Sequence, residues 1–299
     1  MPMMMKMLLQ AVAIVALAPL IQGFIQWCKA RSQNRRGPAP WQPYHNLFKL
    51  LGKDMVTPQT ASWITTITPF ICFAAAFAVA ALAPVFPGQN GGVADLLLVV
   101  YLFGLSRFML ALAGLDTGSS FAGMGSSREM YLAVLVEPAF LLAILAAVGG
   151  AGTTELGAMT GDALKHSFTL PYVLAAVAFF LVTVAECGRI PVDNPDTHLE
   201  LTMFQEAMLL EYSGRELALL HWSIFVRQLG MILLFVRLFL PWSWLDLIPF
   251  ESVWLVGKVF FVAILLAATE TSTAKMRLFR LPDFLAASGL LSLLALVAH

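Results

Sequence analysis

The chain has 299 residues, of which 59% are hydrophobic and only 12% are charged. Soluble domains carry roughly 25% charged residues, so this composition excludes a soluble globular protein and indicates an integral membrane protein. The 18 lysines and arginines balance 18 aspartates and glutamates, so the net charge provides no attraction to nucleic acid. We expect one membrane domain over 1–299, because no linker or low-complexity segment divides the chain.

Long apolar runs follow one another along the chain, and each is about the length of a membrane helix. A hydrocarbon core takes about 20 apolar residues per helix. We therefore predict an all-α, polytopic membrane bundle of about eight transmembrane helices, with additional amphipathic helices on the cytoplasmic side. The predicted spans are 3–27, 63–84, 94–115, 131–149, 170–186, 217–241, 252–270 and 284–298.

Lysines and arginines are distributed unevenly between the two sides of the predicted bundle. Lys6 and Lys165 lie on one side. Twelve others lie on the opposite side, in the loops 28–62, 116–130, 187–216 and 271–283. By the positive-inside rule, these four loops are cytoplasmic and both termini are outside.

The basic loop 28–62 contains an amphipathic segment over 44–53. Lys49 and Lys53 would reach lipid headgroups or a partner protein. The apolar side of the segment consists of Tyr44, Leu47, Phe48, Leu50 and Leu51. The segment is therefore an interfacial helix at the membrane surface, part of a docking platform for a soluble partner, or both.

Two arginines, Arg107 and Arg227, lie deep within predicted spans, where an unpaired charge costs several kcal/mol. We predict that Arg107 pairs with a carboxylate in the bundle. Glu129 and Glu137 lie eight residues apart on about the same helical face. They either pass protons inward or form a structural ion pair with Arg107 or Arg128. The candidate partners for the two buried arginines are Glu129, Glu137, Glu186 and Glu270.

The loop 187–216 and its borders are rich in acids. Only two arginines accompany seven carboxylates in this stretch. The carboxylates are Glu186, Asp193, Asp196, Glu200, Glu206, Glu211 and Glu216. Pro191 and Pro195 preclude one continuous helix, so we predict a compact turn followed by a helix over 199–212. Like-charge crowding raises some of the carboxylate pKa values towards neutrality, which suits proton exchange.

Structural roles remain open for some members of this acidic loop. Asp196 is placed to cap the predicted helix, and Glu211 is placed to pair with Arg215 at a spacing of i, i+4. His198 either titrates near neutral pH or makes a hydrogen bond at the start of the helix.

The segment 114–128 is rich in glycine and serine, and Asp116 is its one acid. It lacks the GK[ST] sequence of a phosphate-binding loop. Small residues more often permit close packing in membranes, which is the role that we predict for this loop.

The cysteines Cys28, Cys72 and Cys187 are scattered singly, without a CxxC pair. Iron–sulfur clusters and structural zinc need several such ligands at close spacing. The five histidines include no facing pair in the middle of a span. We therefore expect that this chain binds no metal or redox cofactor of its own.

These residues carry a resemblance to a known family that covers nearly the whole chain. The motifs are Arg36-Gly37-Pro38, Gln42-Pro43, Lys49-Leu50-Leu51, Gly114-Leu115-Asp116, Ala185-Glu186, Pro191-x-Asp193, Glu200-Leu201 and Glu211-Tyr212-Ser213-Gly214. Together they resemble subunit 1 of respiratory complex I, which joins the soluble arm to the membrane arm. Asp196 and His198 stand where quinone-reducing members have glutamates. The form PVDNPDTHLELTM looks like the counterpart in energy-converting nickel–iron hydrogenases of the formate hydrogenlyase, hydrogenase-4 and Ech types.

The resemblance implies a non-redox subunit of an oxidoreductase complex in the inner membrane of a prokaryote. Its expected partners are the hydrogenase large and small subunits, an iron–sulfur electron-transfer subunit, antiporter-like membrane subunits and the lipid bilayer. The nickel–iron centre and the iron–sulfur clusters would lie in those partners. The expected ion path comprises Glu129, Glu137, Glu186, Asp193, Asp196, Glu200, Glu206, Glu211, Arg107, Asp116 and His198. The expected docking residues are Arg35, Arg36, Gln42, Lys49, Arg189, Arg215, Lys275, Arg277 and Arg280.

Two alternatives predict different properties. A quinone-site subunit of an NADH:quinone oxidoreductase would have a quinone cavity behind the loops 28–62 and 187–216. A free-standing ion transporter would be active without partners.

Overall fold

The computed structural model describes residues 3–83, 85, 95–148, 153–159, 169–193, 203–241 and 248–298. Within these ranges the chain is mainly helical. The α-helices are α1 (Met3–Ser32), α2 (Gln42–Leu51), α3 (Trp63–Leu82), α4 (Leu96–Asp116), α5 (Ser120–Val148), α7 (Leu170–Glu186), α8 (Gln205–Leu209), α9 (Gly214–Phe239), α10 (Ile248–Ser272) and α11 (Leu281–Val297). A short 3-10 helix, η1 (Leu278–Arg280), leads into α11.

The predicted helical membrane bundle is confirmed. Seven helices of the described chain are long and apolar enough to cross a membrane, and α7 is a shorter apolar helix of 17 residues. Each of the eight predicted spans corresponds to one of these helices. The correspondence follows from the length of the apolar runs, because a backbone in hydrocarbon must satisfy its hydrogen bonds within its own helix.

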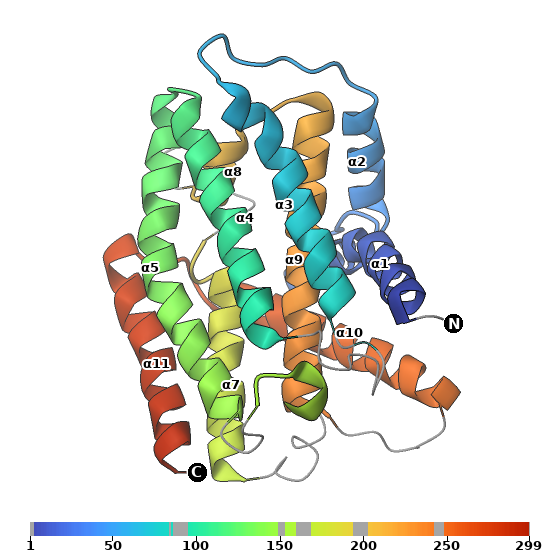
Figure 1. The fold of residues 1–299 in the computed structure, drawn as a ribbon, viewed down its shortest axis with the longest axis vertical. Helices are drawn as coiled ribbons and strands as arrows, with labels where there is room; N and C mark the ends of the chain where they lie inside the picture. The colour runs from blue at the N-terminus through green and yellow to red at the C-terminus, as the bar shows by residue number, and fades with distance from the viewer. Residues whose placement is uncertain are drawn as a thin grey trace.

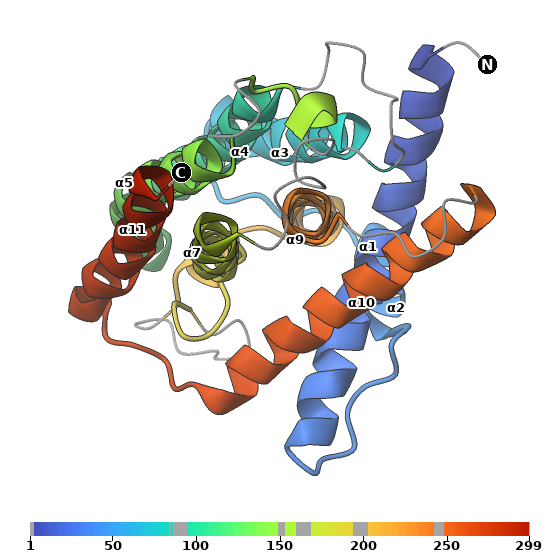
Figure 2. The ribbon, with the colours of Figure 1, turned by 90° about the horizontal axis from the view of Figure 1, so that it is seen from below.

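The helices do not form a simple parallel bundle. Viewed from below, α3, α4, α5 and α11 form a curved row, and α7 and α9 lie inside it (Figure 2). On the open side, α1 and α10 pack against each other and run obliquely across the bundle (Figure 2). As a result α9 is central, and most of its side chains beyond Ser223 are buried.

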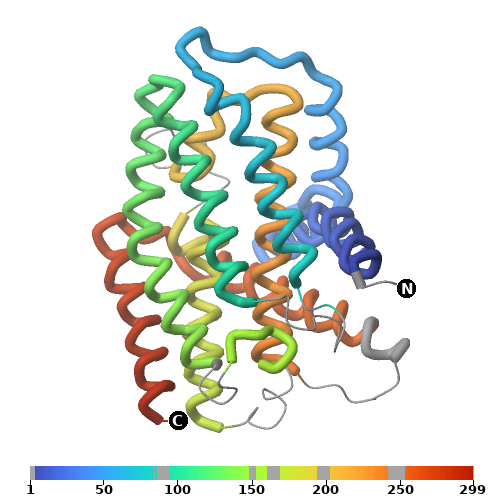
Figure 3. The backbone as a smooth tube through the Cα atoms, viewed as in Figure 1, coloured from blue at the N-terminus to red at the C-terminus, as the bar shows by residue number. Residues whose placement is uncertain are grey.

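The helices also end at different heights. The segment 52–62 crosses the upper end from α2 to α3 (Figure 1), near the N-terminal end of α9. The chain trace shows that α7 and α11 stop well below this level (Figure 3). The described start of the connection after α7 (187–193) and the connection before α11 (273–277) therefore lie low, below the upper ends of the taller helices.

Two predictions of local structure are wrong. The Gly/Ser-rich segment was expected to be a loop up to residue 130, but α5 begins at Ser120. The small residues act inside that helix: a Cβ on Gly125 would meet the Cβ of Ala207 at 2.8 Å, so α8 can approach closely. The predicted role in close packing is therefore confirmed, but its secondary structure is helical.

The helix predicted over 199–212 is shorter than expected. In its described part, α8 covers Gln205–Leu209, and a turn at residues 210–211 precedes α9. Gly214 has a φ of +53°, which glycine adopts readily, and its backbone lies against Asp54. This close approach fixes the backbone at the first residue of α9.

Candidate ion path and docking surface

A buried charge cluster joins α4, α5 and α7. Arg107 on α4 is 3% exposed, and its Nε donates to Glu129 Oε1 on α5 at 3.1 Å. Its Nη2 donates to Glu186 Oε2 at the end of α7. The prediction that Arg107 pairs with a carboxylate is confirmed. Arg227 on α9 is also buried and lies within electrostatic range of Glu129, so this carboxylate interacts with two cations.

Glu137 extends this cluster towards the surface of the bundle. Its Oε1 lies 3.9 Å from Arg107 Nη1, and its side chain is 50% exposed. Glu129 and Glu137 therefore lie near the same guanidinium, one enclosed and the other accessible. Such a series of carboxylates around a shared cation can exchange protons between the exterior and the interior.

A sharp turn after α7 buries the next cation. Gly188 has a φ of +57°, and the N–H of Arg189 donates to the carbonyl of Val184 at 3.1 Å. This is the usual way in which a glycine ends a helix, because its left-handed conformation reverses the chain. The turn directs Arg189 into the interior, where it is 5% exposed.

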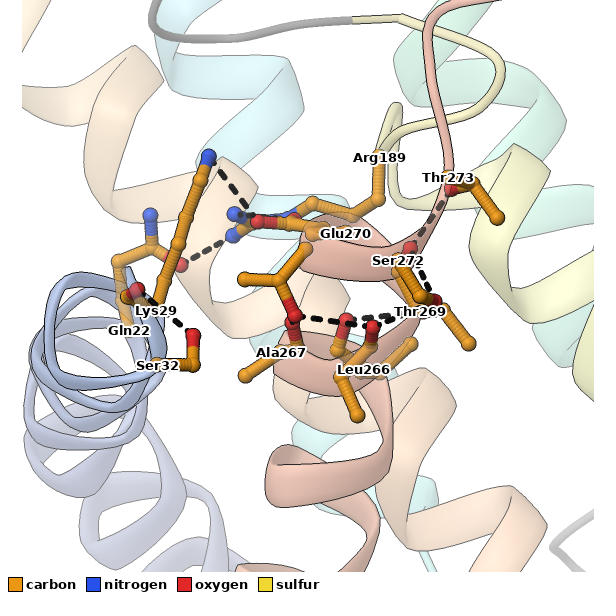
Figure 4. Close-up of polar contacts among 12 residues, drawn as sticks. Gln22, Lys29, Ser32, Arg189, Leu266, Ala267, Thr269, Glu270, Ser272 and Thr273 are labelled. Carbon is orange, nitrogen blue, oxygen red and sulfur yellow. Dashed lines mark hydrogen bonds and ion pairs between the residues drawn. The ribbon is translucent and has the colours of Figure 1, made fainter. Parts of the chain in front are cut away.

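A second charge cluster surrounds Arg189, and the sequence did not predict it. Arg189 Nη1 donates to Glu270 Oε1 on α10 at 3.1 Å, and Lys29 Nζ on α1 lies 3.2 Å from Glu270 Oε2 (Figure 4). Arg189 Nη2 donates to the amide oxygens of Gln22 and, at 2.7 Å, of Gln228. The Glu270 side chain is fully enclosed, at 0% exposure. We call Arg189, Glu270, Lys29, Gln22 and Gln228 the α1–α10 cluster.

Glu270 was expected as a partner of Arg107 or Arg227, and the structure places it with Arg189 and Lys29 instead. The available signal was depth, because Glu270 ends its predicted span 252–270 and Lys29 lies two residues beyond the predicted span 3–27. Sequence reasoning had no means to show that α1 and α10 cross there.

The acidic loop is held to the connection before α11. Lys275 Nζ donates to Asp193 Oδ1 at 2.7 Å, and Asp193 Oδ2 accepts from the Phe204 N–H at 3.2 Å. Lys275 Nζ also lies 5.3 Å from the centre of the Phe204 ring. Asp193 thus joins the two low-lying connections of the bundle.

A cavity of about 590 Å³ lies between α1, α2, α8 and α9, and we call it the α2 cavity. Glu206, predicted for the ion path, lies on its wall, as does Lys49. His221 on α9 lies there too, although the sequence analysis gave it no role. Gln22 belongs both to this wall and to the α1–α10 cluster, so the cavity reaches the buried charges.

The remaining predicted ion-path residues lie elsewhere. Asp116 Oδ2 accepts from Thr65 Oγ1 at 2.7 Å and from the Ser62 N–H at 2.9 Å, so it supports the start of α3. Glu211 lies in the turn between α8 and α9 and is half-buried. Asp196, His198 and Glu200 lie outside the described residues.

Most predicted docking residues are exposed. Arg35, Arg36, Gln42 and Lys49 are exposed near α2, and Arg215, Arg277 and Arg280 are exposed on other elements. Lys275 is half-buried through its ion pair with Asp193. Arg189 differs from the prediction, because its place in the α1–α10 cluster keeps it away from a soluble partner. In the described ranges, no three His, Cys, Asp or Glu side chains lie close enough to hold a metal ion.

The fold and these clusters define a multi-pass membrane protein that holds ionisable groups inside its bundle. A family model described as NADH dehydrogenase matches residues 4–299. The chain therefore belongs to this family, and the resemblance found in its motifs is confirmed.

Individual relatives come from both branches of the family. The chain is 36% identical to formate hydrogenlyase subunit 4 of Escherichia coli (strain K12), over 91% of this chain and 90% of that protein. It is 39% identical to hydrogenase-4 component C of the same organism, over 79% and 75% of the two chains. It is 31% identical to a subunit of the NADH-quinone oxidoreductase of Paraburkholderia xenovorans (strain LB400), over 80% and 72% of the two chains.

The fold also matches a solved structure. A chain of the membrane-bound sulfane sulfur reductase, an archaeal respiratory membrane complex, superposes on the whole chain with a TM-score of 0.89 at 20% identity. At this level of identity the match shows a shared fold.

Proposed function

We propose that this protein is the non-redox membrane subunit of an energy-converting nickel–iron hydrogenase of the formate hydrogenlyase type. It anchors the soluble arm, which carries the nickel–iron centre and the iron–sulfur clusters. It also couples electron transfer in that arm to proton or sodium movement across a prokaryotic inner membrane. The higher identity to formate hydrogenlyase and hydrogenase-4 subunits than to the quinone-linked relative supports the hydrogenase assignment.

The cluster of Arg107, Glu129 and Glu186 is the observation that carries the coupling role. Three ionisable groups are enclosed within membrane-spanning helices, where each costs several kcal/mol to bury. Such groups in membranes most often mark ion pathways. Glu137 gives this cluster an exposed end, and Glu206 lies on the wall of the α2 cavity on the other side of the bundle.

A quinone-site function is the second candidate, and the position of the α2 cavity favours it. The cavity lies between α2 in the loop 28–62 and α8 in the loop 187–216, where a quinone site was predicted. Its volume of about 590 Å³ is within the usual range for small-molecule sites.

The nickel content of the native complex distinguishes these two functions. The complex would be purified from its own membranes through a tag on this subunit, and nickel and quinone would be measured per complex. We expect stoichiometric nickel. An intact multi-subunit complex that contains quinone and no nickel would contradict the hydrogenase assignment.

The coupling role requires a separate measurement on variants. We expect Glu137→Gln and Glu206→Gln to assemble normally but to form a smaller ion gradient per turnover in membrane vesicles. Asp54→Asn is the matched control, because Asp54 is an exposed acid outside both clusters. If both glutamate variants kept the wild-type gradient per turnover, these acids would be structural.

A further inference from the structure

The polar side chains that line the α2 cavity are mainly hydrogen-bond donors. Lys49 and Lys53 contribute ammonium groups, Gln22, Gln26 and Asn46 contribute amides, and His221 contributes an imidazole. The described wall contains one carboxylate, Glu206. Two permanent cations therefore face a single permanent anion, and the lining favours a ligand that carries negative charge.

The layer behind the wall has the same imbalance. Gln22 on the wall accepts a hydrogen bond from Arg189, and Arg189 shares Glu270 with Lys29. Two cations again accompany one carboxylate. This inner layer adds to the positive potential at the end of the cavity, since buried charges are screened less than exposed ones.

The cavity is amphipathic and lies beside an interfacial helix. Its polar groups share the lining with apolar side chains, namely Pro43, Leu47, Leu50, Leu217 and Phe225. On α2, Leu47 is buried while Phe48 is 68% exposed. A short amphipathic helix of this kind favours the boundary between headgroups and acyl chains. Because α2 lies beside the upper end of the bundle (Figure 1), we place the cavity at headgroup depth.

We propose that the α2 cavity binds the headgroup of an anionic phospholipid. Lys49 and Lys53 contact the phosphate, the amides and His221 bind its remaining oxygens, and the apolar residues contact the start of the acyl chains. This assignment does not depend on the hydrogenase function. It gives Lys49 a lipid ligand in place of the predicted contact with a soluble partner.

Other ligands fit these side chains less well. A quinone headgroup is neutral and needs only one or two donors, so it would leave Lys49 and Lys53 with Glu206 as the one anion on the described wall. Free phosphate would satisfy the lysines but would leave the apolar part of the wall in contact with water. An anionic phospholipid satisfies both parts of the lining.

The proposal can be tested on the intact complex in nanodiscs that contain phosphatidylglycerol and phosphatidylethanolamine in equal amounts. After transfer to detergent, the lipids and quinone retained per complex would be measured by mass spectrometry. We expect wild-type protein to retain phosphatidylglycerol, Lys53→Gln to retain it about fivefold less tightly, and Lys49→Gln/Lys53→Gln about 30-fold less tightly, because each lysine near a charged surface contributes about one such factor. Arg31→Gln is the matched control, since Arg31 is an exposed cation of α1 outside the cavity.

Three results would overturn the proposal, provided that gel filtration shows intact complexes. The first is equal retention of phosphatidylethanolamine and phosphatidylglycerol. The second is quinone retained in place of phosphatidylglycerol, with no effect of the lysine variants. The third is complete displacement of the lipid by millimolar inorganic phosphate, which would identify a free-phosphate site.

Discussion

The guanidinium of Arg107 on α4 bonds Glu129 on α5 and Glu186 at the end of α7, and so connects three helices through one cation. Because all three groups are buried, their charges stabilise the bundle only while they are present together. The same contact that supports the proposed ion path is therefore also structural.

Replacing Arg107 by Leu should prevent stable assembly. The change leaves two carboxylates buried beside each other without their nearest cation, and breaking a buried pair costs about 3–5 kcal/mol. The amount of this subunit and of its complex in membranes would be measured by immunoblotting. Arg107→Lys is the control, because it keeps the charge while losing the second contact. Normal assembly of Arg107→Leu would show that the carboxylates are neutral or otherwise balanced.

Glu270→Gln should destabilise the α1–α10 cluster. It leaves Lys29 and Arg189 together without the carboxylate that both contact, and these residues join α1, α10 and the turn after α7. The thermal stability of the purified complex would be compared for Glu270→Gln, Lys29→Met and the double variant. We expect the double variant to lose less than the sum of the single losses, by about 0.5–3 kcal/mol. Strict additivity would mean that the two side chains do not interact.

The length of the apolar runs was sufficient to predict the helices of the bundle, but it did not predict how these helices are arranged in space. The runs around Phe103, Phe179 and Phe235 are long and mainly apolar, so hydrocarbon imposes helices on them. The oblique course of α1 and α10 depends on packing between segments far apart in the chain, and no local pattern encodes it. Arg107 could be predicted to have a partner, because a charge deep in an apolar run requires one. The pairing of Arg189 with Glu270, 81 residues away, was missed because it depends on this packing.

Two glycine variants should differ in stability. Gly214→Ala should destabilise the upper end of the bundle, because φ is +53° and the new Cβ would meet the Asp54 carbonyl oxygen at 2.6 Å. The left-handed backbone alone costs about 1–2 kcal/mol for a residue with a Cβ. Gly257→Ala in α10 is the matched control, since nothing lies within 4 Å of its Cβ position. Thermal unfolding of both variants tests this expectation, and equal stability of the two would contradict it.

Cys187 is half-buried and should react slowly in the native complex. It lies between the two charge clusters, next to the turn that buries Arg189, and burial raises the pKa of its thiol to about 12 despite the nearby guanidinium groups of Arg189 and Arg227. Only the thiolate reacts with maleimides, and on the order of 10⁻⁴ of such a thiol is ionised at pH 8. The prediction is that N-ethylmaleimide leaves Cys187 unmodified at pH 8 in the folded complex, as read from peptide masses. After unfolding in detergent the thiol regains its ordinary pKa of about 8.5 and should be labelled within minutes. Rapid labelling of the folded complex would contradict the raised pKa and would mean that the thiol ionises through its exposed part.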